Sequence, residues 1–438
     1  MKSIFILLAV IAAAGCVSEQ NIQPNDETQE QAVELENQTG IVEEENQTDT
    51  QPVNTVRLDC GNEIGNGDQI VSGPQSPGEG DRDNPFRSLT VNPSSPNVIL
   101  VGTERNGFVR SSDGGNTWER FRYGVRHETE GYTEIYDIGI AANSPNVIYA
   151  ATTLGGPGPL GGSYPSSGGG VYKSSDGGMT WERKNCGIHN NGGRTTAIHV
   201  SDADHVIIGI SAGTTSWFSG DVQQNQFFYG GIYGTSDGGE SWTKASAPEN
   251  ADISGYTYIL QAKSDPSILY TFGLADDPDS SAGFLKSTDS GKTWQPFAAD
   301  MRSLRITHFD ISKDGKTIYA IQDSTDARKI FKSTDWGGSW TNYNLGSSGY
   351  TVTVSPVDSN RILLGKKDGL YLSTNGMTTE KKVLDNKNAN IEDVVFDPSN
   401  SGIVYAIVDG YVMYKSTDAG ETFSKVKDIR NEVLNTIS

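Results

Sequence analysis

Three arginines stand where a charged ligand could be held. Arg87, Arg194 and Arg305 each lie at the start of a stretch that alternates apolar and polar residues, the pattern of a β-strand. Guanidinium groups bind carboxylates through paired hydrogen bonds, so three converging arginines would form an anion site. The alternative is that they are ordinary solvated cations in an acidic chain. The fold decides between these readings, because it determines whether the three side chains meet.

Carboxylates near the same strands offer a second chemistry. A glycosidic bond is hydrolysed by two carboxyl groups about 5–10 Å apart. The candidates are Asp83, Glu128, Glu130, Glu134, Asp221, Glu392 and Asp393. Nothing in their spacing selects one pair, so the sequence leaves both a hydrolase and a non-catalytic protein open.

Histidines and clustered aspartates give weaker signals. His127 and His189 lie in neighbouring polar segments, and three aspartates fall within 276–279, but neither set has the spacing of a metal-binding motif. The glycine-rich stretch 155–170 lacks the strand-to-helix context of a phosphate-binding loop. We therefore expect no metal and no cofactor.

Aromatic residues gather in two long segments that read as loops, 153–170 and 211–230. The candidate ligand-binding residues in them are Tyr164, Trp217, Phe218, Phe227 and Tyr229. Aromatic faces beside the neighbouring Asn and Gln residues suit a glycan or a peptide. The alternative is that the rings pack each loop against its own scaffold.

The elements that position these residues repeat along the chain. A motif of the form Ser/Thr-x-Asp-x-Gly-x-Thr/Ser-aromatic recurs, with one worn copy, and its central residues are Asp113, Asp176, Asp237, Asp289, Asp335, Asn375 and Asp418. The Asp or Asn oxygen can accept hydrogen bonds from backbone N–H groups of its own turn, and the glycines supply positive φ. The motif therefore predicts a hairpin clasp, with structural rather than catalytic carboxylates. The terminal aromatic is placed to pack between neighbouring units.

The flanks of each clasp complete a four-stranded unit. A period-two strand, a turn, a β-branched run such as 146–150, a loop and a short strand precede the clasp, and a further strand follows it. Seven such units predict an all-β protein: a single seven-bladed β-propeller of four-stranded antiparallel blades over residues 85–430.

The clasp resembles the Asp-box, or BNR repeat, of the sialidase, xyloglucanase, sortilin and photosystem II assembly-factor propellers. The resemblance implies the propeller fold but not one function, because those families include hydrolases and non-catalytic binders. Sialidases hold a substrate carboxylate with three arginines, the first in an Arg-Ile-Pro motif that Phe86-Arg87-Ser88-Leu89 matches only in part. They also have six blades and a Tyr–Glu pair that is not found here. Xyloglucanases of this kind cleave between two propellers, whereas this chain has one.

Blade topology predicts where the long loops lie. The clasps and the turns between first and second strands share one face, while the loops between second and third strands and the links between blades share the other. The long loops on this second face are 122–133, 153–170, 183–193, 211–230 and 273–282. Because loops carry binding while a repeated scaffold carries stability, we expect function on that face.

The N-terminus predicts export and lipidation. Lys2 precedes an apolar run over residues 4–14, which is too short to span a bilayer and is typical of a signal peptide. The run ends Ala13-Ala14-Gly15-Cys16, which resembles the lipobox of prokaryotic lipoproteins. We expect a signal peptide over residues 1–15 and acylation of Cys16, so that the membrane is a partner through the lipid anchor.

Composition indicates what the segments between the signal peptide and the propeller are. Residues 16–56 hold many acidic and amide side chains with no Lys, Arg or aromatic residue, which predicts a disordered linker. Residues 57–84 are expected to be an N-terminal extension packing on the propeller, and 431–438 a C-terminal tail. The formal net charge of −21 argues against nucleic acid as a partner, because phosphate binding needs a basic face. The oligomeric state stays open.

The cysteine count fits an oxidising compartment. If Cys16 is lipidated, Cys60 and Cys186 remain, either as a disulfide or as two separate thiols.

These inferences lead to one preferred function and one rival. The preferred hypothesis is a lipid-anchored, non-catalytic recognition or assembly module that binds a protein or glycan at the cell envelope. The alternative is a xyloglucanase- or sialidase-like glycoside hydrolase that acts on extracellular polysaccharide.

Overall fold

The computed structural model describes most of the chain after residue 85. The described ranges are 69–70, 86–103, 107–121, 123–128, 131–132, 134–153, 169–188, 195–211, 213–219, 222–228, 230–248, 253–275, 283–301, 304–323, 328–385 and 390–429. The chain divides at residue 55, and every described residue belongs to the unit 56–438. The calls on residues 1–55, including Cys16, lie outside the described residues.

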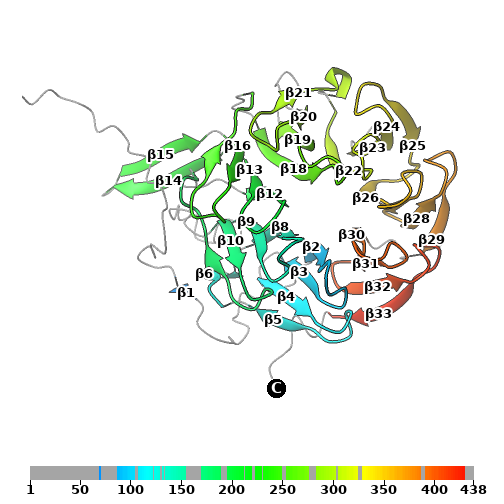
Figure 1. Ribbon diagram of the computed structural model, residues 1–438, viewed down its shortest axis with the longest axis horizontal. Helices are drawn as coiled ribbons and strands as arrows, with labels where there is room; N and C mark the ends of the chain where they lie inside the picture. The colour runs from blue at the N-terminus through cyan, green and yellow to red at the C-terminus, as the bar shows by residue number, and fades with distance from the viewer. Residues whose placement is uncertain are drawn as a thin grey trace, which may run out of the picture. The chain divides into compact units, whose positions relative to one another are not determined.

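Seven four-stranded antiparallel sheets succeed one another along the described chain and surround a common axis (Figure 1). Their strands, blade by blade, are β2 (Phe86–Val91), β3 (Ile99–Thr103), β4 (Phe108–Ser111) and β5 (Glu119–Phe121); β8 (Glu134–Ile140), β9 (Ile148–Thr153), β10 (Gly170–Ser174) and β11 (Glu182–Arg183); β12 (Thr195–Val200), β13 (Val206–Ile210), β16 (Gly231–Thr235) and β17 (Thr243–Lys244); β18 (Ile253–Gln261), β19 (Leu269–Ala275), β20 (Gly283–Ser287) and β21 (Gln295–Pro296); β22 (Ile306–Ile311), β23 (Ile318–Asp323), β24 (Arg328–Ser333) and β25 (Thr341–Asn344); β26 (Gly349–Val354), β27 (Ile362–Lys366), β28 (Gly369–Ser373) and β29 (Lys381–Leu384); β30 (Ile391–Phe396), β31 (Val404–Val408), β32 (Val412–Ser416) and β33 (Ser424–Asp428). The predicted seven-bladed β-propeller is confirmed.

The first strand of every blade carries a β-bulge at the same level. The register shifts between Phe86 and Ser88 in blade 1 and between Ile391 and Asp393 in blade 7, and blades 2, 3, 5 and 6 shift at the corresponding place, while the first strand of blade 4 has two shifts. A bulge turns the following side chain away from its regular direction. In blades 2, 5 and 7 the side chain after the bulge, that of Asp137, His308 or Asp393, contacts the first strand of the next blade.

The core lies between blades rather than inside any one of them. Phe108 of blade 1 stacks on Trp181 of blade 2 with ring centroids 3.7 Å apart. In six blades the clasp ends in an aromatic residue that packs against strands of the preceding blade, as Trp118 does with Tyr405 and Met413 across the first and last blades; the clasp of blade 6 has Thr379 at this position. Apolar burial therefore joins each blade to its neighbours, and this burial is the main force that holds the ring together.

The ring closes without a shared strand. Blade 1 takes its four strands from 86–121 and blade 7 from 391–428, so among the described strands none crosses between them. Side-chain packing holds this seam, and the polar contacts across it include the Leu89 N–H donating to Asp393 Oδ2 at 3.1 Å and Lys427 Nζ donating to the Asn116 carbonyl at 2.8 Å.

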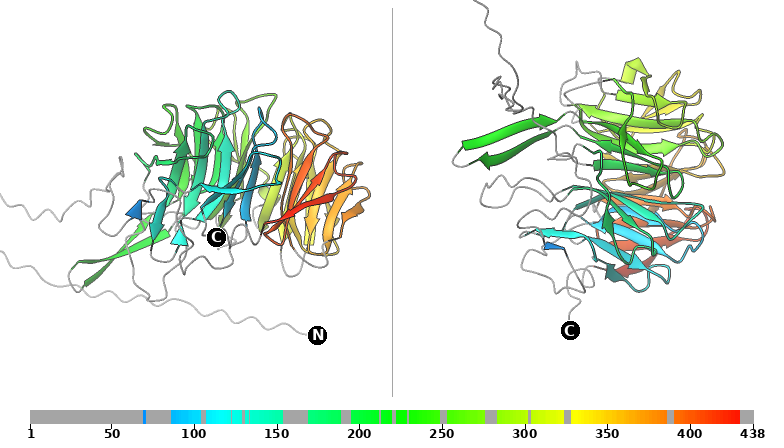
Figure 2. Two further views of the ribbon diagram at one scale, coloured as in Figure 1. Left: turned by 90° about the horizontal axis from the view of Figure 1, so that it is seen from below. Right: turned by 60° about the vertical axis from the view of Figure 1, so that its left-hand side comes forward.

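Two small sheets are inserted into the blades. The hairpin β14 (Gly213–Ser219) and β15 (Val222–Phe228) lies between the second and third strands of blade 3, and β6 (Arg126–Glu128) and β7 (Gly131–Tyr132) lie in the link from blade 1 to blade 2. β1 (Gln69–Ile70) adds to β6. Both inserts come from the same face by blade topology, and Figure 2 (left) shows them on one side of the ring. The reading of 211–230 as a loop is thus wrong for its larger part, which pairs as a hairpin.

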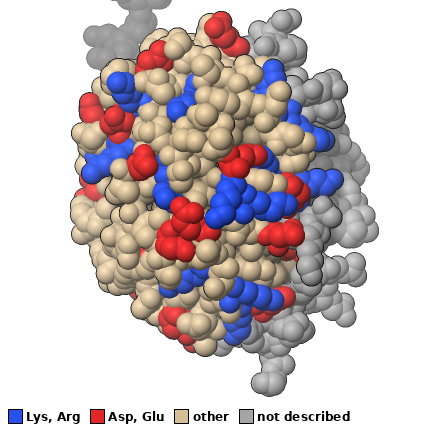
Figure 3. Space-filling model, turned by 90° about the vertical axis from the view of Figure 1, so that its right-hand side faces the viewer, with Lys and Arg blue, Asp and Glu red and all other residues tan. Residues whose placement is uncertain are grey.

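The outer surface opposite these inserts carries both signs of charge. Figure 3 shows the side of the ring near β25 and β29, where Lys and Arg are interspersed with Asp and Glu. Lys382 pairs with Asp368 at 3.1 Å, and Arg361 with Glu421 at 3.1 Å.

A short 3₁₀ helix, η1 (Ala299–Met301), lies between blades 4 and 5. Among the described residues, none lies in a helix with the length and apolar character needed to cross a membrane.

Candidate functional site

The clasps share one hydrogen-bond pattern. In blade 1, Thr117 donates its N–H to Asp113 Oδ1 at 2.8 Å and its hydroxyl to Oδ2 at 2.7 Å, while Ser111 Oγ donates to Oδ1 at 2.9 Å. Equivalent bonds form at Asp176, Asp237, Asp289, Asp335 and Asp418. In blade 6, Asn375 Oδ1 accepts the Thr379 N–H at 2.9 Å and Nδ2 donates to the Thr379 hydroxyl.

These bonds keep the clasp carboxylates ionised. Hydrogen bonds from Thr117 lower the pKa of Asp113 to about 2, and bonds from Ser241 and Ser339 do the same for Asp237 and Asp335. A carboxylate with both oxygens occupied and so low a pKa is neither a general acid nor a free base near neutral pH. The clasps therefore act as fasteners of the fold.

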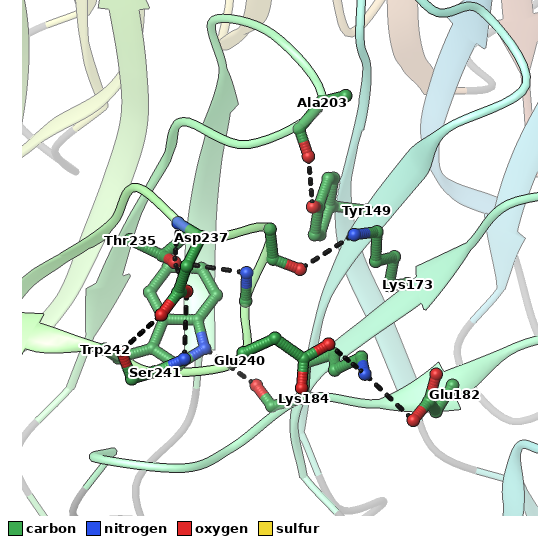
Figure 4. Close-up of polar contacts among 12 residues, drawn as sticks. Tyr149, Lys173, Glu182, Lys184, Ala203, Thr235, Asp237, Glu240, Ser241 and Trp242 are labelled. Carbon is green, nitrogen blue, oxygen red and sulfur yellow. Dashed lines mark hydrogen bonds and ion pairs between the residues drawn. The ribbon is translucent and has the colours of Figure 1, made fainter.

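Each clasp is also tied to its surroundings on the same face. In all seven blades a backbone N–H of the clasp donates to a carbonyl of the turn between the first two strands, as Gly238 does to Asp204 in blade 3. Figure 4 shows the polar contacts between blades 2 and 3 on the clasp face. Lys173 Nζ donates between these blades to the Gly238 carbonyl at 2.9 Å, and Lys184 binds both Glu182 and Glu240. The polar groups of the clasp face thus hold neighbouring blades together.

A second set of polar side chains joins the first strands around the axis. Asp137 Oδ2 accepts the Ile198 N–H of the next blade at 3.0 Å. Asp393 Oδ2 accepts the Leu89 N–H in the same way across the closing seam. Both aspartates are the first paired residues after a bulge, which is the reason that they face the neighbouring blade.

In blade 5, two side chains accept main-chain N–H groups of the next blade. His308 Nδ1 accepts the Val352 N–H of blade 6 at 3.4 Å, and Asp310 Oδ2 accepts the Val354 N–H at 2.7 Å. His308 also lies against Tyr258 of blade 4, with ring centroids 4.5 Å apart. We call Asp137, Asp310, Asp393, His308 and Tyr258 the axial cluster.

Burial shifts the titration of the axial cluster. It raises the pKa of Asp137 and Asp393 to about 7 and that of Asp310 to about 6, against the opposing effect of the backbone bonds. The charges of Asp137 and Asp310 raise the pKa of Asp393 further. Burial lowers the pKa of His308 to about 3, so this imidazole is neutral at pH 7. Asp137 and Asp393 are therefore partly protonated near neutral pH, although each of these carboxyl groups already accepts a main-chain N–H.

The described residues include two of the three candidate arginines. Arg87 occupies the bulge of β2, Arg194 lies outside the described residues, and Arg305 is exposed just before β22. The three-arginine anion site stays a prediction. The fold brings Asp393 to the axis, but as a blade-joining residue.

The aromatic candidates fall into two groups. Trp217, Phe218 and Phe227 are residues of the β14–β15 hairpin. Tyr164 and Tyr229 lie outside the described residues. The hairpin therefore carries three of the five aromatic candidates.

The remaining sequence candidates are scattered. His127 lies in β6 opposite Gln69, and His189 and residues 276–279 are outside the described ranges. Within the part of the chain that the structure describes, no three His, Cys, Asp or Glu side chains are grouped as a metal site. Cys186 is disulfide-bonded, but Cys60 lies outside the described residues, so their pairing stays a prediction.

Sequence reasoning missed most of the axial cluster. Asp137, His308 and Asp310 stand in period-two strands, where a polar residue is ordinarily read as facing solvent. The available signal was positional: Asp137 and Asp393 follow the same strand start in two different repeats.

Comparisons with known proteins support a propeller family. A family model described as sortilin and neurotensin receptor 3 matches residues 169–327. No curated protein sequence matches the chain.

Solved structures give the fold. An ancestral GH74 enzyme superposes with a TM-score of 0.58 at 16% identity, covering 78% of this chain and 46% of its own. The GH74 enzyme of Niastella koreensis gives 0.54 at 16% identity, with 78% and 53% covered. YCF48 bound to D1 peptide gives 0.55 at 12% identity, with 81% and 97% covered. The chain thus spans about half the length of these GH74 enzymes and almost all of YCF48.

Proposed function

We propose that this chain is a non-catalytic recognition or assembly module of the Asp-box type, which binds a protein or glycan through the face that bears the inserts. One observation carries the proposal: the β14–β15 hairpin and the β1–β6–β7 sheet both arise on the face opposite the clasps. The clasp carboxylates serve the scaffold, whereas the hairpin adds nothing to a blade sheet. A repeated scaffold with additions on one face is the usual layout of a binding propeller.

The comparisons support this proposal through length. YCF48, whose structure contains a bound peptide, is matched over 97% of its chain. A single propeller of this size is therefore large enough to bind a peptide. The GH74 enzymes are matched over about half of theirs, 46% and 53%.

Export and lipidation at Cys16 belong to the same proposal. They would hold the propeller at the envelope by an acidic tether over residues 17–56. In a bacterial host, Cys16→Ser is expected to move the full chain from the membrane fraction to the soluble fraction. Unchanged membrane association of this variant would contradict the anchor and leave the propeller's binding role standing.

The binding role is tested on arrays of envelope peptides and of glycans. The full chain is compared with a variant in which Gly213–Phe228 is replaced by two glycines. We expect binding to be lost on this deletion while the melting temperature by calorimetry stays within the error, because the hairpin belongs to no blade sheet. Binding that survives the deletion would move the site elsewhere.

A glycoside hydrolase is the second candidate, favoured by the axial cluster. A general acid for glycosidic cleavage needs a carboxyl that is protonated near neutral pH, and Asp137 and Asp393 have a pKa of about 7. Turnover of a polysaccharide panel that Asp137→Asn or Asp393→Asn abolishes would establish this candidate. Asp113→Asn in a clasp is the matched control, with turnover unchanged.

A further inference from the structure

The β14–β15 hairpin is a two-stranded sheet of its own among the described strands. Its strands of seven residues each pair without a register shift, from Gly213 opposite Phe228 to Ser219 opposite Val222. It extends away from the blades in both views (Figures 1 and 2). An isolated hairpin is marginally stable in water, and a third strand is the ordinary way to stabilise it.

The edges of this ribbon lack the protection that the blade edges have. Free strand edges in proteins are guarded by charges, proline or bulges. Six of the seven outermost blade strands contain a charged residue or a proline, β25 being the exception. The ribbon strands, Gly213–Ser219 and Val222–Phe228, contain neither, and they have no bulge. Among the described strands, the scaffold edges are thus guarded, whereas the edges of this longer pair carry no such protection and no third strand.

The register identifies the backbone groups on these edges. Ser219 pairs with Val222 across two intervening residues, a spacing at which the flanking pair of a hairpin is hydrogen-bonded. Because bonded and non-bonded pairs alternate, the pair Ser216 and Asn225 is non-bonded. Their N–H and C=O groups point outward, one set on each edge. The same holds for residues 214 and 218 on β14 and for 223 and 227 on β15.

We propose that this ribbon accepts an extended, non-acidic polypeptide segment as a third β-strand, held by main-chain hydrogen bonds along one of its edges. The inference rests on the proposed function and specifies how the partner binds. Affinity in this mode comes from the backbone ladder, and selectivity from alternate side chains. By register, Trp217 and Phe228 belong to one face of the ribbon and Phe218 and Phe227 to the other, so both faces carry aromatic positions.

Charge determines the kind of occupant. The chain has a net charge of −21, so a second copy or an acidic segment would be repelled, whereas the ribbon strands themselves are uncharged. A neutral or basic segment with β-branched or aromatic residues is therefore the partner that fits.

The experiment separates the contribution of main-chain hydrogen bonds to binding from that of side chains. The probe is a synthetic peptide of alternating Val and Thr with a lysine at each end, titrated against the full chain by fluorescence anisotropy. Ser216→Pro and Asn225→Pro each remove an outward N–H from one edge, whereas Ser216→Val and Asn225→Val keep it. We expect one proline variant to weaken binding about tenfold or more, and both valine variants to bind within about twofold of the wild type.

Two controls keep the result interpretable. Thr215→Pro removes an inward N–H of the hairpin itself, so it should behave like the ribbon deletion. The probe peptide with alternate residues N-methylated retains its side chains but loses donors, and it should bind about tenfold more weakly.

Each contrary outcome has a defined meaning. If both outward proline variants bind the probe like the wild type, strand addition is refuted. If array binding is lost on ribbon deletion but kept in both proline variants, strand addition fails while the proposed function stands. Self-association in sedimentation that the proline variants abolish would make a second copy the occupant, and ribbon-dependent binding to lipid vesicles would make it a membrane; either overturns the proposal.

Discussion

Asp393 offers the sharpest test of how the ring is closed, through the variant Asp393→Asn. The carboxyl has a pKa raised from 3.8 to about 7, mainly by burial. A carboxyl with a raised folded-state pKa stabilises the protein fully below its unfolded pKa, and this contribution is lost as pH rises through the folded value. Wild-type Asp393 therefore favours folding at pH 5 and ceases to do so by pH 8. Asn cannot titrate, yet its Oδ1 can still accept the Leu89 N–H.

The magnitude follows from the shift. One pH unit corresponds to about 1.4 kcal/mol, and pH 5 lies about two units below the folded pKa of about 7. The difference in unfolding free energy between variant and wild type should change by about 3 kcal/mol between pH 5 and pH 8, in the variant's favour at the higher pH. Partial exposure of the side chain makes this an upper bound.

The assay is urea unfolding of both proteins at half-unit steps from pH 5 to pH 8. Asp113→Asn is the matched control, because a carboxyl with a pKa of about 2 does not titrate in this range. Its stability curve should run parallel to that of the wild type. Parallel curves for Asp393→Asn as well would refute the reasoning, since they would mean that the seam holds no titrating carboxyl.

Three further changes test the scaffold. Asp176→Ala removes the acceptor for the Thr180 N–H and hydroxyl, so the unfolding free energy should fall by about 1–2 kcal/mol with binding unchanged; lost binding at unchanged stability would make the clasps ligands. Trp181→Ala removes the ring stacked on Phe108, and calorimetry should show a loss of about 3–5 kcal/mol; a loss below about 1 kcal/mol would mean that the blades are held otherwise. Gly187→Ala places a Cβ against the Trp242 carbonyl at a φ of 90°, so it should lower the unfolding free energy by about 2 kcal/mol or more. Gly346 has a φ of 71° but open space around it, so Gly346→Ala should cost only its backbone strain. Equal losses at these two glycines would show that the close contact is unimportant.

The repeat made most of the fold predictable. The clasp residues around Asp113 and its equivalents have a local explanation, so their number and spacing predicted the blades before any long-range contact was known. The polar groups at the axis had no such signature. Asp137 acquires its role from a bulge and from the Ile198 N–H, 61 residues away in sequence. Nothing local distinguishes it from a solvent-facing residue of an alternating strand.

The β14–β15 hairpin was not predicted, for a different reason. Gly220-Asp221 between two β-prone runs is a recognised two-residue hairpin signal. Residues 223–226 are all polar, so this run lacks the alternation of apolar residues that indicates a strand. Tyr164 and Cys60 stand in segments with no repeat pattern, so no equivalent in another blade could indicate their positions.

The seam between the first and last blades has a consequence for assembly. Among the described blade strands, every main-chain ladder joins neighbouring strands of one blade, whereas Leu89 and Asp393 are 304 residues apart. The entropy of closing so long a loop is therefore spent in one late step, after the blades themselves can form. A chain truncated before blade 7 should consequently persist as an open arc, with its two terminal blade surfaces unsatisfied and prone to stick to other copies.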